Sequence, residues 1–286
     1  MLKYDQVLKH VYRTALTSLP AFTLLAFTLL AATFMTLTAC SFSSKDSAPK
    51  RDVNVANIPD AKPKIEPYSR GGNPSSYSVF GKTYHVMADG SNYVERGIAS
   101  WYGTKFHGNK TSNGEVYDMY GMTAAHKSLP IPTYVQVTNL KNGKKVILRV
   151  NDRGPFHASR IIDLSYVAAK KLGITGTGTG FVEVRAINPR TWQQGKRQPS
   201  KGTSVAAGSF DSLYIQAGAF SSQYNANKLK QQLNALFPNQ SIQLAKDGQD
   251  QLFRVRVGPL ATVGEADRVA QIISDNGYPT PHVILE

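Results

Sequence analysis

The sequence has one cysteine among its 286 residues, and acidic side chains are scarce, 19 against 33 basic ones. A lone cysteine cannot form a disulfide within the chain, so the fold must depend on packed cores, for which a hydrophobic content of 41% suffices. The sequence also lacks a His-Glu-x-x-His motif, and two distant histidines, His107 and His126, are a weak sign of a metal site. We therefore expect no metal and no other cofactor.

The first forty residues combine positive charge with a long apolar run. Three basic residues precede an apolar stretch at 19–39, which is the pattern of a secretory signal peptide. The run also approaches the roughly 20 residues of a transmembrane helix, which is the alternative. It ends in LTAC, a sequence that resembles the lipobox of bacterial lipoproteins, and Ser41 in place of Asp implies the outer membrane by the same resemblance. We expect cleavage after residue 39 and a lipid (palmitate) anchor on Cys40, facing the periplasm.

The positive charge is concentrated in the middle of the chain. Residues 81–210 carry 18 basic and 7 acidic side chains, a net charge of +11, whereas residues 211–286 carry 6 and 7, a net charge of −1. A basic field favours polyanionic partners, and nucleic acid is the usual one. An exported lipoprotein rarely meets nucleic acid, but it does meet peptidoglycan, whose muramyl carboxylates make it acidic. We expect binding to peptidoglycan and not to nucleic acid.

Two polar stretches divide the chain into domains. Residues 40–80 are rich in Ser, Pro, Lys and Asn without hydrophobic periodicity, so we expect a lipidated N-terminus and a flexible tether. A similar stretch at 188–210 reads as a linker. The divisions therefore predict a first domain at 81–187 and a second at 211–286.

The second domain contains an internal repeat of forty residues. IQAGAF (215–220) aligns with VRVGPL (255–260), and each is followed by an amphipathic helical pattern. Strand-like SIQLA (241–245) and PHVIL (281–285) complete a βαββαβ order, an α/β sandwich with one sheet. Strand alternation turns one set of side chains towards the helices, namely Ile215, Ala217, Phe253, Val255 and Val257.

The opposite sheet face bears groups suited to a sugar polymer, unless it is simply a solvated face. Its residues are Tyr214, Gln216, Arg254 and Arg256. The Q-x-G-x-F start and the F-R-V-x-V-G-P second strand resemble the SPOR domain family over nearly all of 211–286. The resemblance implies binding of septal glycan strands stripped of stem peptides, through the open sheet face with Phe220 of the first motif.

The first domain reads as a small β-barrel with one helix and long loops. Strands are expected at YVERGIASWYG (93–103), TYVQVTNL (133–140), KKVILRV (144–150) and FVEVRAI (181–187), the middle two joined in a hairpin around Asn142-Gly143. A short helix at 165–174 has Ser165 to cap it and Gly173 to end it.

The longest loop, residues 103–118, carries the polar groups His107, Thr111 and Glu115, and Asp152 lies in a turn after the strand that ends in LRV. Cleavage of a glycosidic bond generally needs a carboxylic acid and a second group that stabilises the oxocarbenium-like centre. Glu115 and Asp152 are the candidates from the residues alone. Solvated loop acids are the alternative.

Residues 97–187 are similar almost throughout to the barrel of the rare lipoprotein A family, from ASWYG and FHGNKTSNGEVYD to VNDRGPF and RIIDLS. The resemblance implies a six-stranded double-psi β-barrel of the barwin and expansin type and a lytic transglycosylase acting on peptidoglycan. It carries the acidic pair onto Glu115 and Asp152 and implies that His126 and Asp163 line or brace the groove. His107, Thr111 and Arg153 are further candidates for substrate binding, with Arg153 facing away from Asp152.

The expected reaction cleaves the MurNAc–GlcNAc bond of peptide-stripped strands at the division septum and leaves 1,6-anhydro-MurNAc ends. Expected partners are glycan strands, the membrane through Cys40 and septal division proteins. Two alternatives remain: an inverting hydrolase, which needs carboxyl groups about 6.5–9.5 Å apart, and a non-catalytic, expansin-like wall-binding or scaffold protein.

Overall fold

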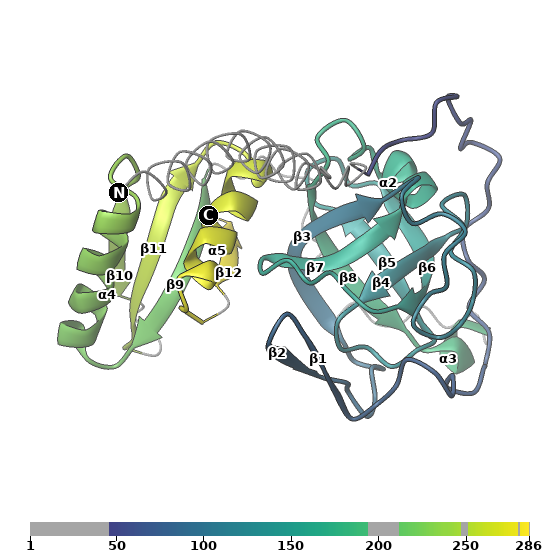
Figure 1. Cartoon of the computed structure of the whole chain (residues 1–286), viewed down its shortest axis with the longest axis horizontal. Helices are drawn as coiled ribbons and strands as arrows, with labels where there is room; N and C mark the ends of the chain where they lie inside the picture. The colour runs from purple at the N-terminus through teal and green to yellow at the C-terminus, as the bar shows by residue number, and fades with distance from the viewer. Residues whose placement is uncertain (1–45, 194–211, 247–250, 280, 286) are drawn as a thin grey trace, which may run out of the picture. The chain divides into compact units, whose positions relative to one another are not determined.

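The computed structural model describes residues 46–193, 212–246, 251–279 and 281–285 (Figure 1). The expected signal peptide, the lipobox with Cys40 and most of the expected linker lie outside these residues. Within the described ranges, no helix combines the length and apolar character needed to cross a membrane.

The first domain is a closed barrel of six strands, as expected (Figure 1), and the strands follow the order β3-β7-β4-β6-β5-β8. Two strand pairs, β3 with β7 and β4 with β6, are parallel, and the other pairs are antiparallel. The strands span Val94–Tyr102 (β3), Thr123–His126 (β4), Thr133–Asn139 (β5), Lys145–Asp152 (β6), Arg160–Ser165 (β7) and Gly180–Ile187 (β8).

The barrel is filled by apolar side chains that alternate along its strands. Val135 and Val137 of β5 and Leu148 and Val150 of β6 are fully buried. Helix α2 (Tyr166–Leu172) packs against this core, begins at Ser165, whose hydroxyl accepts from the Ala168 amide, and ends at Gly173 with φ 76°. Both predicted helix boundaries are therefore confirmed, and the rigid barrel leaves the carboxyl end of β6 free to present polar groups.

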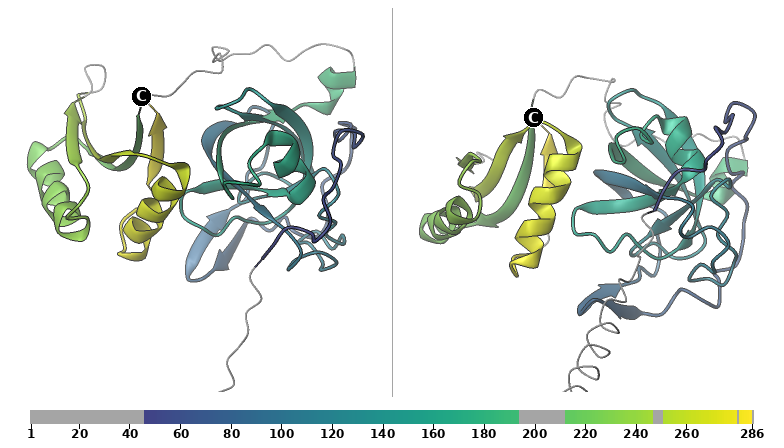
Figure 2. Two further views of the ribbon diagram at one scale, coloured as in Figure 1. Left: turned by 90° about the horizontal axis from the view of Figure 1, so that it is seen from above. Right: turned by 45° about the horizontal axis from the view of Figure 1, so that its top comes forward.

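The segment before the barrel differs from the expected flexible tether. Residues 46–73, here called the N-terminal strap, run along the outside of the barrel and hydrogen-bond to it at several points (Figures 1 and 2). The strap is followed by a hairpin of β1 (Ser76–Val79) and β2 (Lys82–His85). Backbone hydrogen bonds and ion pairs to Arg149, Lys170 and Lys171 order a stretch whose composition alone indicates a tether.

The expected linker begins with structure as well. Helix α3 (Pro189–Gln193) follows β8 directly, and Trp192 on it is partly exposed. The first residues of the expected linker are therefore helical.

The second domain has the predicted βαββαβ order. Its sheet runs β10-β11-β9-β12, and helices α4 and α5 pack on it (Figure 2). The elements span Leu213–Phe220 (β9), Gln223–Leu236 (α4), Ile242–Lys246 (β10), Phe253–Leu260 (β11), Val263–Asp275 (α5) and His282–Leu285 (β12). Ile215, Val255 and Val257 are fully buried in a core with the helices, which confirms their predicted face.

Two side chains expected on the open sheet face are placed differently. A register shift between β9 and β11 puts Gln216 opposite Arg256 but Phe220 opposite Phe253, so the rest of β9 changes face. Phe220 consequently packs against the core on the helix side. Tyr214 is only 8% exposed, and a Cβ at Gly258 would meet its ring. Gln216, Arg254 and Arg256 remain partly exposed.

Candidate functional site

Glu115 lies on a tight turn in the long loop of the barrel. The Thr111 amide donates to the Glu115 carbonyl at 2.8 Å, and the Gly114 amide donates to the Thr111 carbonyl at 2.9 Å. Gly114 has φ 90°, a conformation that L side chains rarely adopt. The Thr111 hydroxyl donates to Asn113 at 2.6 Å and is 5% exposed. Thr111 therefore braces the turn, and its expected role in substrate binding remains a prediction.

Asp152, at the end of β6, holds this turn in place. Its Oδ1 accepts from the Ser112 amide at 2.8 Å, from the Ser112 hydroxyl at 2.7 Å and from the Arg153 amide at 2.8 Å. Ser112 is three residues from Glu115, so its two hydrogen bonds to Asp152 connect the turn of Glu115 to the end of β6. These two hydrogen bonds are called the latch below. Ser112 was not among the predicted site residues, although it lies in the motif that carries Glu115.

The carboxylate of Glu115 is fixed by two side chains of β6. Arg149 Nη1 donates to both oxygens, at 2.8 and 2.9 Å, and Asn151 donates to Oε2 at 2.9 Å. Partial burial raises the pKa of Glu115, but the hydrogen bonds from Asn151 and Arg149 outweigh it and lower the pKa overall. Because the side chain is still 43% exposed, Glu115 is an accessible, ionised carboxylate at neutral pH.

Arg149 also binds an acid from the N-terminal strap. Its Nε and Nη2 donate to Glu66 at 3.0 and 3.1 Å, and Glu66 accepts a further hydrogen bond from Tyr134 at 2.6 Å. The Arg149 guanidinium thus bridges the carboxylate of Glu66 in the strap and the carboxylate of Glu115 in the loop of the barrel. Neither Arg149 nor Glu66 was among the predicted site residues.

Arg153 turns away from the Asp152 carboxylate, as predicted. Its guanidinium donates to the carbonyls of Gly72, His126 and Leu129 and to the side chain of Asn73. These bonds tie the strap to the loop after β4. Arg153 therefore connects the strap to the barrel, and its expected role as a substrate ligand remains a prediction.

His126, at the end of β4, is 2% exposed. Its Nδ1 accepts from the Ser128 and Leu129 amides, so Nε2 carries the proton and donates to Tyr93 at 2.8 Å. Burial and two nearby cations lower the pKa of His126 to about 3, which keeps the ring neutral. Of the two expected roles, lining or bracing the groove, these contacts support bracing.

Asp163 lies in the same row of the barrel as Asp152. Strand pairing sets Asp152 beside Ala125, and Ala125 beside Asp163, so the two acids are separated by two strand spacings, about 10 Å. Burial raises the pKa of Asp163, although a hydrogen bond from Ser100 opposes the shift. Asp163 thus lies at the same height along the barrel as Asp152. Its contact with substrate remains a prediction.

His107 lies at the other end of the loop that carries Glu115. Its Nδ1 accepts from the Met119 amide at 3.2 Å, and its ring packs edge-on against Tyr120. The ring is 41% exposed, so substrate binding by His107 also remains a prediction. Within the described parts of the chain, no group of three or more His, Cys and acidic side chains could hold a metal ion.

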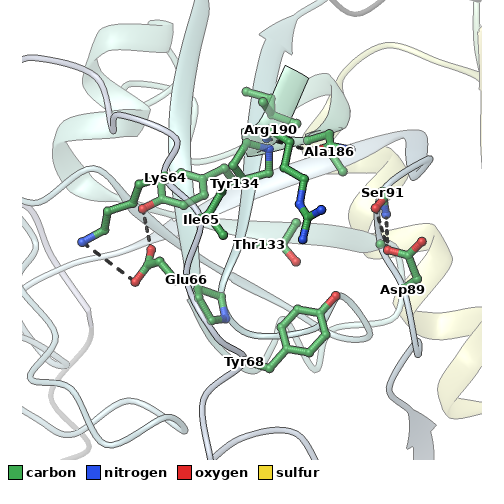
Figure 3. Close-up of a pocket in the computed structure, with 15 residues that line it drawn as sticks. Lys64, Ile65, Glu66, Tyr68, Asp89, Ser91, Thr133, Tyr134, Ala186 and Arg190 are labelled. Carbon is green, nitrogen blue, oxygen red and sulfur yellow. Dashed lines mark hydrogen bonds and ion pairs between the residues drawn. The ribbon is translucent and has the colours of Figure 1, made fainter. Parts of the chain in front are cut away.

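An open groove of about 690 Å³ adjoins Glu115. One side is formed by Glu115, Arg149 and Tyr120 of the barrel, and the other by residues 58–66 of the strap. A smaller pocket of about 320 Å³ lies next to it, and the two share Lys64, Glu66 and Tyr134 (Figure 3). An ionised carboxylate beside an open groove can stabilise positive charge that develops on a bound molecule.

Fold and site together define a two-domain protein with a double-psi barrel bearing carboxylates and a separate βαββαβ domain. Residues 94–185 match the family model described as lytic transglycolase, and residues 209–285 match the SPOR domain. A crystal structure of the RlpA SPOR domain from Pseudomonas aeruginosa shares 28% identity and covers 25% of this chain and 96% of its own, with a TM-score of 0.24.

Two curated relatives carry the name endolytic peptidoglycan transglycosylase RlpA. The Pseudomonas aeruginosa protein is 42% identical over 82% of this chain and 84% of its own length. The Vibrio cholerae protein is 57% identical over 50% of this chain and 54% of its own. The chain therefore belongs to the rare lipoprotein A family.

Proposed function

We propose that this protein is a peptidoglycan lytic transglycosylase that cleaves the MurNAc–GlcNAc bond and forms 1,6-anhydro-MurNAc ends. The observation that carries the proposal is the latch between Asp152 and Ser112. It holds the turn of Glu115 at the barrel rim, beside a groove open to a polymer. The names of the relatives support the same activity.

In the proposed mechanism, Asp152 donates a proton to the glycosidic oxygen while the bond from that oxygen to C1 of MurNAc breaks. The resulting carboxylate then takes the proton of the C6 hydroxyl, whose oxygen attacks C1 and closes the anhydro ring. No water is consumed. Glu115, kept ionised by Arg149 and Asn151, stabilises the positive charge that develops at C1.

We further propose that the protein acts at the division septum on strands stripped of stem peptides, anchored to the outer membrane by lipid on Cys40. The LTAC sequence and Ser41 support the anchor, and the SPOR domain supports the septal glycan target. Septal division proteins are proposed partners on the same grounds.

The test is mass spectrometry of products from purified mature chain and peptide-free strands, with Glu115→Gln and Asp152→Asn alongside. We expect anhydro-muramyl ends from the wild type and a loss of about 10²- to 10⁴-fold in the Asp152 variant, the usual range for a proton-transfer group. Reducing ends would instead identify a hydrolase. Glycan binding without cleavage would identify a wall-binding protein of the expansin-like kind.

A further inference from the structure

Residues 58–66 of the N-terminal strap form a fixed wall of the groove. Lys171 of α2 donates to the Ile58 carbonyl and to Asp60. The other oxygen of Asp60 accepts from the Ile147 amide, and the Ala61 amide donates to the Ile147 carbonyl. At the far end, Glu66 binds Arg149 and Tyr134. The wall is therefore held at both ends by the barrel.

This wall places two cations in the groove that Glu115 also lines. Lys62 and Lys64 line the groove and are exposed, and Glu115 and Arg149 are among its other lining residues. Lys64 lies 4.0 Å from Glu66, with 67% of its side chain exposed, and Figure 3 shows it beside the Glu66–Tyr134 contact. Glu66 is already held by Arg149, so the charge of Lys64 is only weakly compensated.

The chemistry of the substrate fits two cations at this place. Each muramyl residue of a stripped strand carries a lactyl group that ends in a carboxylate. Where a stem peptide is attached, the same carbon is a neutral amide that carries a bulky chain. A fixed wall with two lysines favours the first form by charge, and it leaves less room for the second.

We propose that Lys62 and Lys64 form a subsite for the lactyl carboxylates of MurNAc, so that the strap selects stripped strands. This inference rests on the proposed transglycosylase activity. It assigns the preference to the barrel itself, in addition to any selection by the SPOR domain.

The test compares the mature wild type with the double variant Lys62→Gln/Lys64→Gln on two substrates. These are stripped strands and the same strands whose lactyl carboxylates have been converted to methylamides. Lys141→Gln/Lys145→Gln is the matched control, because it removes the same charge from exposed positions at the remote end of the β5–β6 hairpin. Thermal unfolding shows that all three proteins are folded.

We expect the variant to lose about fivefold in kcat/KM on charged strands, as two exposed ion pairs predict, and nothing on methylamide strands. The control should behave as wild type on both substrates. An equal ratio of the two rates in wild type and variant overturns the subsite while leaving the proposed activity intact. Absence of anhydro ends from every wild-type reaction overturns the proposed activity, and the subsite with it.

Discussion

At the scale of single residues, Asn151 and Arg149 together lower the pKa of Glu115, and Arg149 is the one that carries charge. It lies between Glu66 and Glu115 and holds the Glu115 carboxylate with two hydrogen bonds. The lowered pKa of Glu115 keeps it ionised to a lower pH than a free glutamate. If the ionised form is the active one, kcat/KM falls as pH drops through this pKa, and Arg149 sets where the fall begins.

Arg149→Gln should therefore move the acid limb of the pH profile of kcat/KM to higher pH. The reason is that removing the guanidinium takes away one of the contacts that lower the pKa of Glu115. The measurement is the rate of anhydro-end formation on stripped strands as a function of pH.

Glu66→Gln is the control for this experiment, because it changes the other partner of Arg149 and leaves the Arg149–Glu115 pair in place. It should not move the limb upward. The same upward shift in both variants would mean that the limb does not report Glu115.

Some of these residues could be read from the sequence and others could not. Glu115 and Asp152 follow from a motif, and the orientation of Arg153 follows from the alternation of adjacent residues along a strand. Arg149 and Asn151 could have been predicted as well, because these polar residues alternate with the buried Leu148 and Val150 along one strand. Glu66 could not have been predicted, because its contact with Arg149 depends on the path of the strap, which the local sequence does not specify.

At the scale of elements, short strands and long-range pairs were hardest to predict. β4 has four residues and β7 six, and each makes one parallel pair with a strand distant in the chain. The bulge in β9, which places Phe220 on the other face, was not predicted either. A bulge arises from the pairing of two strands and cannot be read from the composition of one strand. The capped helix α2 and the Asn142-Gly143 hairpin were predicted because their signals are local.

The strap offers a prediction at this scale, because two neighbouring lysines of α2 fix different parts of it. Lys171 holds residues 58 and 60 beside the groove, whereas Lys170 holds residues 52 and 53. Lys171→Gln should lower the free energy of unfolding by about 1 kcal/mol and also lower turnover on stripped strands. Lys170→Gln should leave turnover near wild type. Thermal unfolding and product analysis measure the two effects, and equal turnover in both variants would contradict a groove wall built by the strap.

At the scale of the whole molecule, the proposed roles of the two domains differ: the barrel cleaves the strand and the SPOR domain binds it. Each has its own apolar core, and the charge is unequal, +11 for residues 81–210 and −1 for residues 211–286. The barrel carries the carboxylates and most of the basic field, whereas the SPOR domain presents Gln216, Arg254 and Arg256 on its sheet. A weak binder joined to a catalytic domain raises the local substrate concentration without adding contacts at the site.

Deletion of residues 211–286 should therefore leave turnover on short soluble strands within about twofold of wild type, since every group proposed for the reaction lies in the barrel. On intact sacculi the same deletion should reduce product formation by 10²-fold or more, the order of gain that linked binding sites provide. Parallel assays on the two substrates measure this ratio. If the deletion abolishes turnover on soluble strands while the barrel still unfolds cooperatively, the SPOR domain takes part in catalysis itself, and the division of work argued above is wrong.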